Sequence, residues 1–301
     1  MHLPVRLLAI DVDGTLLPNV GHAITSRTAR ALKAAQQAGI HVVIATGRRT
    51  AFTTPLLADL NLRADTCLIT SNGAVVRTLG GELIDRTAME PAVARALCTL
   101  LRPFGCVVFT FDRPGRPELV LENMEEAHER IALWIDANRD AIEVVQPLEE
   151  AFSLGAGAED FPIQGMSAGT VYQMRQAEAA VKASPLAELC SWACTEYPAR
   201  DLSILDLMPA GVSKGAALQR LADRLGIDRK AVMAIGDNWN DVDMLEFAGQ
   251  PVVMGNAAPA LRTMAKTLGW RQAPRNDQDG VAHTLDYVLS RLAPATAEEC
   301  L

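Results

Sequence analysis

Two spacings of hydrophobic residues alternate along the first 75 positions of the chain. Compact apolar runs cover residues 5–10, 40–45 and 67–70, and each has the length of a buried strand. Between these runs, residues 26–38 and 50–60 carry apolar side chains at helical spacing. Buried strands that alternate with helices indicate a parallel sheet covered on both faces. This part of the chain therefore predicts an α/β fold.

A different texture begins after Ala74. Gly80 and Gly81 separate two short strand-like stretches, which predicts a β-hairpin over residues 75–86. Between about residues 88 and 200, helices and short strands follow one another without regular alternation. We predict helices at 91–101, 125–138 and 176–189, strands at 106–112, 118–121, 142–145 and 170–175, and a loop at 155–162. This mixture predicts an inserted α+β domain.

The alternation of strand and helix returns after about residue 202. Strands are predicted at 203–207, 231–235 and 251–254, and helices at 213–225, 241–248 and 259–268. The two outer segments, residues 1–85 and 201–292, are therefore expected to form one discontinuous α/β core. Residues 86–200 form the insertion, and residues 293–301 are expected to be a flexible tail.

Charge and composition narrow the class of partner. The 301-residue chain has a formal net charge of −8, which argues against nucleic acid or an anionic membrane as a partner. No apolar run approaches the roughly 20 residues of a membrane span, and the N-terminus does not resemble a signal peptide. The six cysteines are scattered, which favours a reducing, cytoplasmic location. The chain is expected to be a monomer or a homodimer.

Polar residues follow four of the predicted core strands, and the first group contains two carboxylates. Asp11 and Asp13 are two residues apart on an extended segment, so both can face one site. Such close carboxylates repel each other unless a cation or a shared proton relieves them, and hard oxygen ligands favour Mg²⁺. Taken alone, the pair is equally well explained as an incidental solvated turn.

The second and third groups have the chemistry of an anion site. Thr46, Gly47 and Arg48 follow a strand and open a helix, which is an arrangement that can cradle a phosphate. A plain threonine N-cap would produce the same pattern. Lys214 enters the first turn of another helix, where the helix dipole disfavours a cation unless an anion lies nearby. A solvent-exposed lysine is the simpler alternative.

The fourth group brings further carboxylates to the same sheet edge. Asp237 and Asp241 flank Trp239 and Asn240 directly after a strongly apolar strand. Asp241 could serve only as the N-terminal acid of its helix. Trp239 is open to two interpretations, because its indole could line a substrate entrance or pack beneath the loop. Since the carboxyl ends of parallel strands meet in one crevice, all four groups are expected to converge.

These motifs, in this order, resemble those of the haloacid dehalogenase superfamily of phosphotransferases. Residues 70–74, 253–257 and 277–282 further resemble its Cof-type subgroup (type IIB), which carries a large α/β cap between the second and third motifs. The resemblance implies a Rossmann-like core, with residues 86–200 as a cap that determines substrate specificity. It also implies a Mg²⁺-dependent phosphoric monoester hydrolase.

The resemblance assigns roles to individual residues. Asp11 is implied to be the nucleophile that forms an aspartyl-phosphate, and Asp13 the general acid and base. Mg²⁺ is implied to be bound by the Asp11 carboxylate, the Asp13 backbone carbonyl and Asp237, with Asp241 beside the ion but not bonded to it. Thr46 and Lys214 are implied to hold the phosphoryl oxygens. Four further candidates for phosphate or substrate contact are Gly47, Arg48, Asn72 and Asn240.

The expected substrate is a small phosphorylated metabolite, such as a sugar phosphate. Three alternatives remain open at this point: a phosphomutase of the same superfamily, a receiver-like module that only accepts a phosphoryl group, and an inactive sugar-phosphate binder. Asp13 argues against the receiver-like module, because an acid and base allows turnover. The insertion argues against it as well, because it offers a substrate lid.

Overall fold

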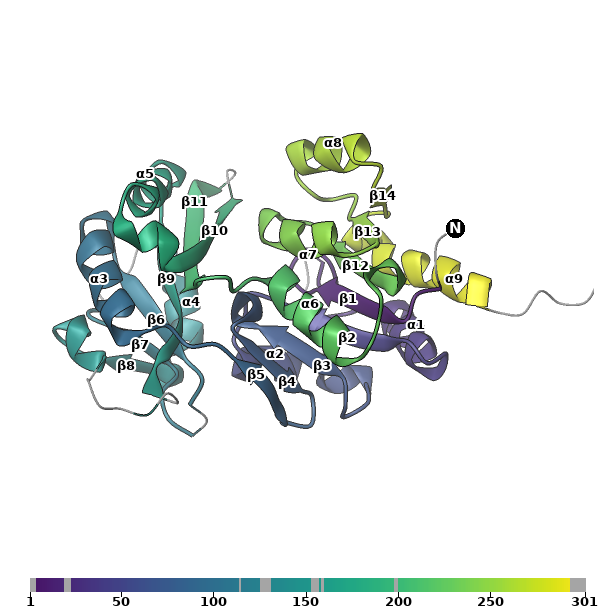
Figure 1. Cartoon of the computed structure of the whole chain (residues 1–301), viewed down its shortest axis with the longest axis horizontal. Coiled ribbons are helices and arrows are strands. Elements are labelled where there is room, and N and C mark those ends of the chain that lie inside the picture. Colours follow the sequence, from purple (N-terminus) through teal and green to yellow (C-terminus); the bar gives the residue numbers. More distant parts are fainter. Residues whose placement is uncertain are drawn as a thin grey trace, which may run out of the picture. The chain divides into compact units, whose positions relative to one another are not determined.

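The computed structural model describes residues 4–18, 23–113, 115–124, 131–152, 157, 160–197 and 200–292. The chain divides into two compact units. The first contains the residues up to Ile84 together with those from Lys214 onward, and the second contains Asp85–Ser213. Each unit is built around its own sheet (Figure 1). None of the described helices is both long and apolar enough to cross a membrane.

An eight-stranded sheet forms the centre of the first unit, in the order β14-β13-β12-β1-β2-β3-β4-β5. The strands from β14 to β3 run parallel, and β4 is antiparallel to β3. The strands are β1 (Leu7–Asp11), β2 (His41–Ala45), β3 (Cys67–Thr70), β4 (Val75–Thr78), β5 (Leu83–Arg86), β12 (Val232–Gly236), β13 (Gln250–Val253) and β14 (Arg271–Gln272). The predicted α/β fold with a parallel sheet is confirmed.

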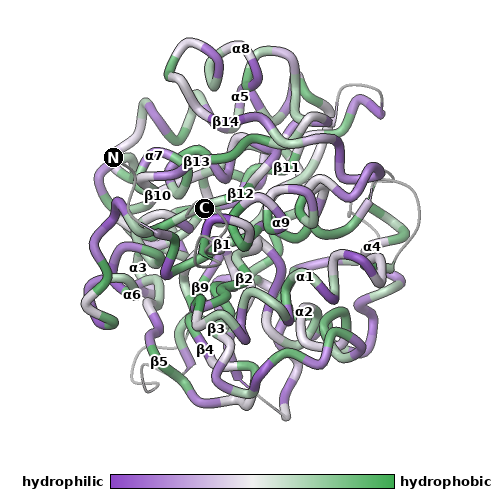
Figure 2. The backbone as a smooth tube through the Cα atoms, turned by 90° about the vertical axis from the view of Figure 1, so that its right-hand side faces the viewer, coloured by the Kyte–Doolittle hydropathy of each residue, from purple (hydrophilic) through white to green (hydrophobic). Residues whose placement is uncertain are grey.

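Helices cover both faces of this sheet. One face packs on α1 (Ser26–Gln37), α2 (Thr50–Leu57) and α9 (Gly280–Leu292). The other packs on α6 (Lys214–Arg224), α7 (Val242–Phe247) and α8 (Pro259–Thr267). Every residue of β1 and β12 is buried, as continuous apolar strands between two helical layers require. In Figure 2, β2 is drawn largely in the green of hydrophobic residues, and its last four residues are buried.

The second unit has a six-stranded sheet in the order β10-β11-β9-β6-β7-β8. The pairings are antiparallel except that of β7 with β8. Its strands are β6 (Val107–Phe111), β7 (Leu119–Leu121), β8 (Ile142–Val144), β9 (Pro162–Gly169), β10 (Cys190–Tyr197) and β11 (Leu202–Pro209). Its helices are α3 (Pro91–Leu101), α4 (Ala132–Ala137) and α5 (Val171–Lys182). In its core, the rings of Phe109 and Phe152 pack edge to face, with their centroids 4.7 Å apart.

In the second unit, one predicted strand is wrong and one predicted helix has different bounds. Residues 170–175 were expected to form a strand, but Thr170 caps α5 instead: its hydroxyl accepts from the Gln173 N–H, and the Gln173 side chain accepts from the Thr170 N–H. This capping box overrides the β-branched residues at the start of the segment. The expected helix at 176–189 is correspondingly the end of α5, followed by a short turn at Pro185–Glu188.

The boundary after residue 200 also needs correction. The strand predicted at 203–207 was assigned to the core, but it forms β11, which pairs with β9 and β10. Leu205 and Leu207 are fully buried in the hydrophobic cluster of the second unit. Residues 201–213 therefore belong to the second unit. The tail predicted at 293–301 and part of the helix predicted at 125–138 lie outside the described residues.

Candidate active site

The order of the sheet brings distant segments to one edge. Successive strands are added from β1 to β2 and β3 on one side, and from β12 to β13 and β14 on the other. The strand order therefore reverses between β1 and β12, although the two strands are parallel. Ile10 is in register with Ile235, and Asp11 with Ala45. Asp11, Asp237 and Thr46 thus follow three neighbouring strands at the reversal point, where open α/β sheets bind ligands.

A buried ion-pair cluster lies at this edge. Lys214 Nζ donates to Asp11 Oδ1 at 2.8 Å and to Asp241 Oδ1 at 2.7 Å. The Lys214 and Asp241 side chains are fully buried, and that of Asp11 is 6% exposed. Lys214 was expected either near an anion or in solvent, and the structure places it between two carboxylates. Such a buried cation is retained only when charges of opposite sign compensate it.

Asp241 also holds the loop that carries Asp237. Its Oδ2 accepts the backbone N–H groups of Asp237 and Asn238, both at 3.0 Å. With Oδ1 bound to Lys214, both carboxylate oxygens have partners. Asp241 is therefore the acid of a helical N-terminus and a partner of Lys214 at the same time.

Asp237 lies closely packed against the loop that follows β1. Its Oδ1 accepts from the Thr15 hydroxyl at 3.2 Å. Gly14 has φ +85, and a Cβ atom at this position would lie 2.2 Å from Asp237 Oδ2. Glycine is required here by both the backbone conformation and the close approach of Asp237.

Three carboxylates at this edge fit a divalent metal ion. Asp11, Asp237 and Asp241 each offer an oxygen, and these atoms lie within 4.8 Å of one another. All the donors are hard oxygens, as Mg²⁺ prefers. Asp241 is the weakest direct ligand of the three, because its fully buried oxygens already bind the Lys214 ammonium and two backbone N–H groups, whereas each Asp237 oxygen accepts from one neutral side chain.

Burial perturbs the protonation of these groups. It raises the pKa of Asp11 to about 7, reinforced by the charge of Asp241 and opposed by Lys214. Burial, together with the charges of Asp11 and Asp241, raises the pKa of Asp237 to about 9. Burial acts to lower the pKa of Lys214, but Asp11 and Asp241 outweigh it and raise that pKa above its ordinary range. A bound cation would relieve this excess of negative charge.

Asp13 has a different environment from Asp11. Its side chain is 49% exposed and is bound by the Arg48 guanidinium, whose Nε donates to Asp13 Oδ2 at 2.7 Å. The same guanidinium lies 5.1 Å from the centre of the Phe52 ring. The two aspartates at the end of β1 therefore differ in burial and in the cation that each contacts.

The segments predicted to cradle a phosphate are connected to one another by hydrogen bonds. Thr46 Oγ1 accepts the Arg48 N–H at 3.1 Å, and the Thr46 carbonyl accepts the Asn72 N–H at 3.1 Å. A Cβ atom at Gly47 would lie 3.1 Å from Asn72 Oδ1, so a larger residue would crowd that amide. Asn240 Nδ2 donates to the same Asn72 oxygen at 3.3 Å.

Ser71 and Asn72 are unusual in backbone and in hydrogen bonding. Both adopt positive φ (+49 and +52), which non-glycine residues seldom do. Ser71 Oγ and Asn72 Nδ2 are buried and have no hydrogen-bond partner among the described residues. Strained backbone and unsatisfied buried donors occur together at functional sites. Here they lie on the segment that follows β3, beside Thr46.

Comparison with known proteins agrees with this geometry. The sequence matches the family described as haloacid dehalogenase-like hydrolase over residues 8–285, which is most of the chain. The chain belongs to this family. The hydrolase is 30% identical over 300 residues to the 5-amino-6-(5-phospho-D-ribitylamino)uracil phosphatase YwtE of Bacillus subtilis, covering 95% of this chain and 99% of the relative. It is also 30% identical to an HMP-PP phosphatase of Yersinia pseudotuberculosis, covering 95% and 96%.

Solved structures support the same assignment. A haloacid dehalogenase-like hydrolase from Bacteroides thetaiotaomicron superposes with a TM-score of 0.75 at 25% identity, covering 94% of this chain and 99% of that one. A sugar phosphatase described as subclass IIB superposes with a TM-score of 0.72 at 25% identity, covering 94% and 98%. The predicted Cof-type, type IIB resemblance is confirmed. The relatives are named as phosphatases, which agrees with the predicted phosphoric monoester hydrolase.

Trp239 of this hydrolase is 45% exposed, although it lies between Asp237 and Asn240. Its backbone N–H donates to Asn238 Oδ1 at 2.8 Å, which fixes the turn without fixing the indole. Both interpretations left open by the sequence, an indole at a substrate entrance and an indole packed beneath the loop, stay predictions. An exposed aromatic surface next to the buried cluster is available to a bound molecule.

Two contacts of the site were not assigned from the sequence of the hydrolase. Thr15 and Asn256 both contact the Asp237 carboxylate, at 3.2 Å each. Both residues lie inside motifs that carried the family resemblance, so the available signal was their position in those motifs. Their side chains have ordinary loop chemistry and reveal no role until β13 is placed beside β12.

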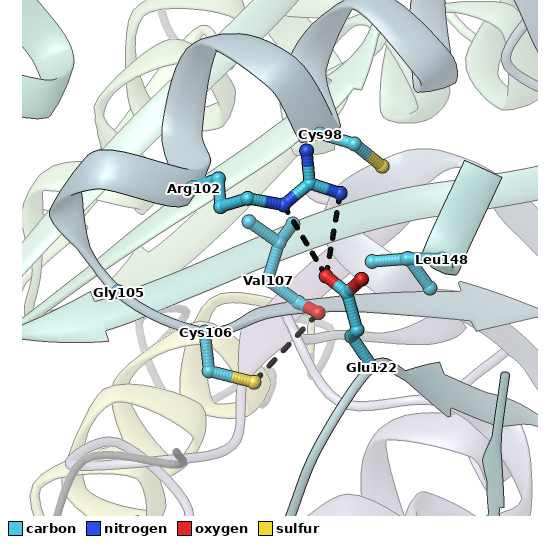
Figure 3. A pocket seen from close by; sticks show the side chains of 7 residues that line it. All are labelled: Cys98, Arg102, Gly105, Cys106, Val107, Glu122 and Leu148. Carbon is cyan, nitrogen blue, oxygen red and sulfur yellow. Dashed lines mark hydrogen bonds and ion pairs between the residues drawn. The ribbon is translucent and has the colours of Figure 1, made fainter. Parts of the chain in front are cut away.

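A separate small hollow lies in the second unit of the hydrolase. Figure 3 shows Arg102 and Glu122 facing each other across it, with Nε to Oε2 at 3.3 Å, and Cys98 and Cys106 at its margin. Its volume of about 30 Å³ suits roughly one water molecule. It does not have the size for a metabolite.

Proposed function

We propose that the chain is a Mg²⁺-dependent phosphatase that hydrolyses a small phosphorylated metabolite through an aspartyl-phosphate on Asp11. The observation that carries this proposal is the buried contact of Lys214 with Asp11. This contact lies next to Asp237, at the edge of the sheet where the strand order reverses. A core does not need a buried lysine held between carboxylates, whereas transfer of an anionic group does.

The metal would be held by the Asp11 and Asp237 carboxylates and the Asp13 backbone carbonyl. Asp241 would steady this set without bonding to the ion, because its oxygens hold Lys214 and the 237–238 backbone. An Mg²⁺ ion held there would supply positive charge to neutralise the phosphoryl oxygens.

In the first half of the reaction, a carboxylate oxygen of Asp11 attacks phosphorus. The bond from phosphorus to the ester oxygen breaks, and that oxygen takes a proton from Asp13 and leaves as an alcohol. Lys214 orients Asp11 through Oδ1 and keeps a positive charge where negative charge accumulates. The exposed position of Asp13 suits it to meet both a leaving group and water.

In the second half, Asp13 accepts a proton from water as that water attacks the phosphorus of the aspartyl-phosphate. The bond to Asp11 breaks, inorganic phosphate leaves, and the Asp11 carboxylate is restored. Thr46 and Lys214 are the proposed donors to the phosphoryl oxygens. Contact with phosphate or substrate is also proposed for Gly47, Arg48, Asn72 and Asn240. It is supported by the buried Asn72 Nδ2, which has no hydrogen-bond partner within the described part of the chain.

The proposed substrate class is a sugar phosphate or a similar small phosphate ester. Its support is chemical breadth among relatives, one named for a phosphorylated ribitylamino uracil and one described as a sugar phosphatase. The second unit is proposed to choose among such substrates. The protein is proposed to work in the cytoplasm, and its state as monomer or homodimer stays a prediction.

Phosphate release from a panel of phosphorylated metabolites tests the proposal. The wild type should release phosphate from at least one sugar or nucleoside phosphate with Mg²⁺ and lose this activity in EDTA. The substitution Asp11→Asn should reduce the rate by about 10³-fold or more, because the nucleophile is lost. Asp59→Asn, at an exposed aspartate on the surface of the same unit, is the matched control and should be unaffected. Activity that survives Asp11→Asn would disprove the nucleophile.

The same assay separates the alternatives. A phosphomutase would convert a sugar monophosphate to an isomer and release little free phosphate. A receiver-like module would keep the phosphoryl group on Asp11 for minutes without turnover. The expected result is rapid release of phosphate with an unrearranged alcohol as the second product.

A further inference from the structure

In the first unit, one side chain joins the two loops that are proposed to hold the metal, those after β1 and β12. Asn256 lies on the loop after β13, and its Nδ2 donates to the Gly14 carbonyl at 2.8 Å and to Asp237 Oδ2 at 3.2 Å. Gly14 belongs to the loop after β1, and Asp237 belongs to the loop after β12. A single amide group therefore connects the two loops on either side of the point where the strand order reverses.

The orientation of this amide is fixed by its third contact. Asn256 Oδ1 accepts the backbone N–H of Asn276 at 2.9 Å. A backbone N–H can only donate, so the oxygen must face Asn276. The Nδ2 group then faces two acceptors, the Gly14 carbonyl and the Asp237 carboxylate, and the opposite flip would leave acceptors facing one another.

Asn276 extends the same connection back to the first loop. Its side chain is buried, and its Nδ2 donates to the Leu17 carbonyl at 3.1 Å. The loop after β1 is thus bound at Gly14 by Asn256 and at Leu17 by Asn276. Segments near both ends of the chain are held together by two side-chain amides.

The contacts around Asp237 leave its carboxylate little freedom. Thr15 occupies Oδ1, Asn256 occupies Oδ2, and Gly14 approaches so closely that no Cβ could be accommodated. Removing the Asn256 side chain takes away the hydrogen bond to Asp237 Oδ2, so the carboxylate can rotate more freely. It also removes the hydrogen bond to the Gly14 carbonyl. The spacing between Asp237 and the β1 loop depends on this amide.

We propose that Asn256 is a positioning residue that sets the affinity of the site for Mg²⁺ by orienting Asp237 against the β1 loop. This inference rests on the proposed metal-dependent function. Hydrogen-bond partners of metal ligands typically contribute about 10- to 100-fold in metal affinity. The side-chain hydrogen bonds of Asn256 to described residues go to Gly14, Asp237 and Asn276, and none goes to Asp11.

Mg²⁺ binding to the metal-free protein, measured by isothermal titration calorimetry without substrate, tests the proposal. Asn256→Ala and the smaller change Asn256→Ser should each raise the Mg²⁺ Kd about 10-fold or more. The matched control is Asn138→Ala in the second unit, which removes a buried amide that donates to the Trp134 carbonyl at 2.8 Å. That control should leave the Mg²⁺ Kd within twofold of the wild type.

Enzyme kinetics add a second measurement. The Mg²⁺ concentration for half-maximal activity should rise in parallel with Kd, while kcat at saturating Mg²⁺ should stay within about threefold of the wild type. Thr15→Val removes the other side-chain partner of the Asp237 carboxylate. Because both residues bind one carboxylate, the Mg²⁺ Kd of the double variant should differ from the value that the two single effects predict by addition.

The proposal is overturned if folded Asn256 variants bind Mg²⁺ within twofold of the wild type, or if the wild type does not bind it. It is also overturned if both variants fail to fold at high Mg²⁺, because a positioning role leaves the core intact. If Mg²⁺ binding weakens as expected but no metabolite yields phosphate, the proposed function fails while the positioning role stands.

Discussion

The two aspartates at the end of β1 belong to two contrasting halves of one site. The buried half contains Asp11, Lys214 and Asp241, with charges held at 2.7–2.8 Å and withdrawn from water. The open half contains Asp13 and Arg48, whose side chains are 49% and 26% exposed. Residues two apart in sequence therefore meet very different surroundings, because β1 ends between them.

The two halves are suited to different chemical roles. Fixed, desolvated charges act strongly and need no rearrangement when charge develops, which suits chemistry at phosphorus. Exposed groups that water can reach suit proton exchange with a leaving group and with water. Substitutions in the buried half should therefore affect both stability and catalysis, and those in the open half should affect catalysis alone.

The largest effect is expected from Lys214→Met. This change leaves Asp11 and Asp241 buried without a cation, which should cost about 3–5 kcal/mol of unfolding free energy. Phosphate release should fall about 10³-fold or more. Urea unfolding and the phosphate assay check these outcomes together. If the variant kept wild-type stability, the buried half would not depend on this cation.

The next effect concerns pH in the absence of metal. Burial raises the pKa of Asp11 to about 7 and of Asp237 to about 9, above the unfolded value of 3.8. The folded state then binds more protons than the unfolded state between about pH 4 and 9, so stability falls as pH rises through that range. In EDTA, the Tm should drop by several degrees from pH 5 to pH 9. Added Mg²⁺ should raise the Tm most at the alkaline end of this range.

Asp237→Asn sharpens this prediction. The amide cannot ionise, so the metal-free variant should lose less stability at alkaline pH than the wild type and gain less from Mg²⁺. Thermal unfolding of both proteins across this pH range, with and without EDTA, provides the comparison. Equal slopes for the two proteins would contradict the assignment of the effect to Asp237.

A smaller effect is expected from Arg48→Gln in the open half. It removes the guanidinium that holds Asp13 and should lower kcat/KM by about tenfold. An exposed ion pair contributes little stability, so the unfolding free energy should change by less than about 1 kcal/mol. Arg63→Gln, in the exposed pair with Asp65, is the control and should leave kcat/KM unchanged.

The smallest effect is expected from Trp239→Ala. The exposed indole is free to contact a substrate, so its loss should raise KM about two- to fivefold and leave kcat and Tm nearly unchanged. Trp239→Phe should retain most of the wild-type KM. Leu268→Ala, at another exposed apolar residue of the same unit, should leave KM unaffected. A large drop in Tm would show that the indole has a packing role instead.

Much of the first unit could be predicted from the sequence, because its strands are continuous apolar runs between helices. The segment after Asp11 and the one after Gly236 were expected at one edge, and strand order places them there. Asn256 could not be assigned in this way. Its role depends on contacts with Gly14, Asp237 and Asn276, which lie up to 242 positions away in the sequence.

The second unit was harder to predict, for a physical reason. β10 and β11 each contain polar as well as apolar residues, so that, considered locally, β10 resembles a loop and β11 a strand of the core. Capping at Thr170 depends on a side chain three residues away, and it decided between helix and strand where local propensity pointed the other way. The error at residues 201–213 followed from the same ambiguity.

The pairing of β1 with β12 also has a consequence for the order of synthesis. β1 ends at Asp11, but its neighbour β12 ends at Gly236, and the whole second unit lies between them in the sequence. A growing chain can complete the contiguous second unit while β1 still lacks a partner on one side. The candidate active site can therefore form only after the second unit has been synthesised, and until then the unpaired edge of β1 is open to pairing with other strands.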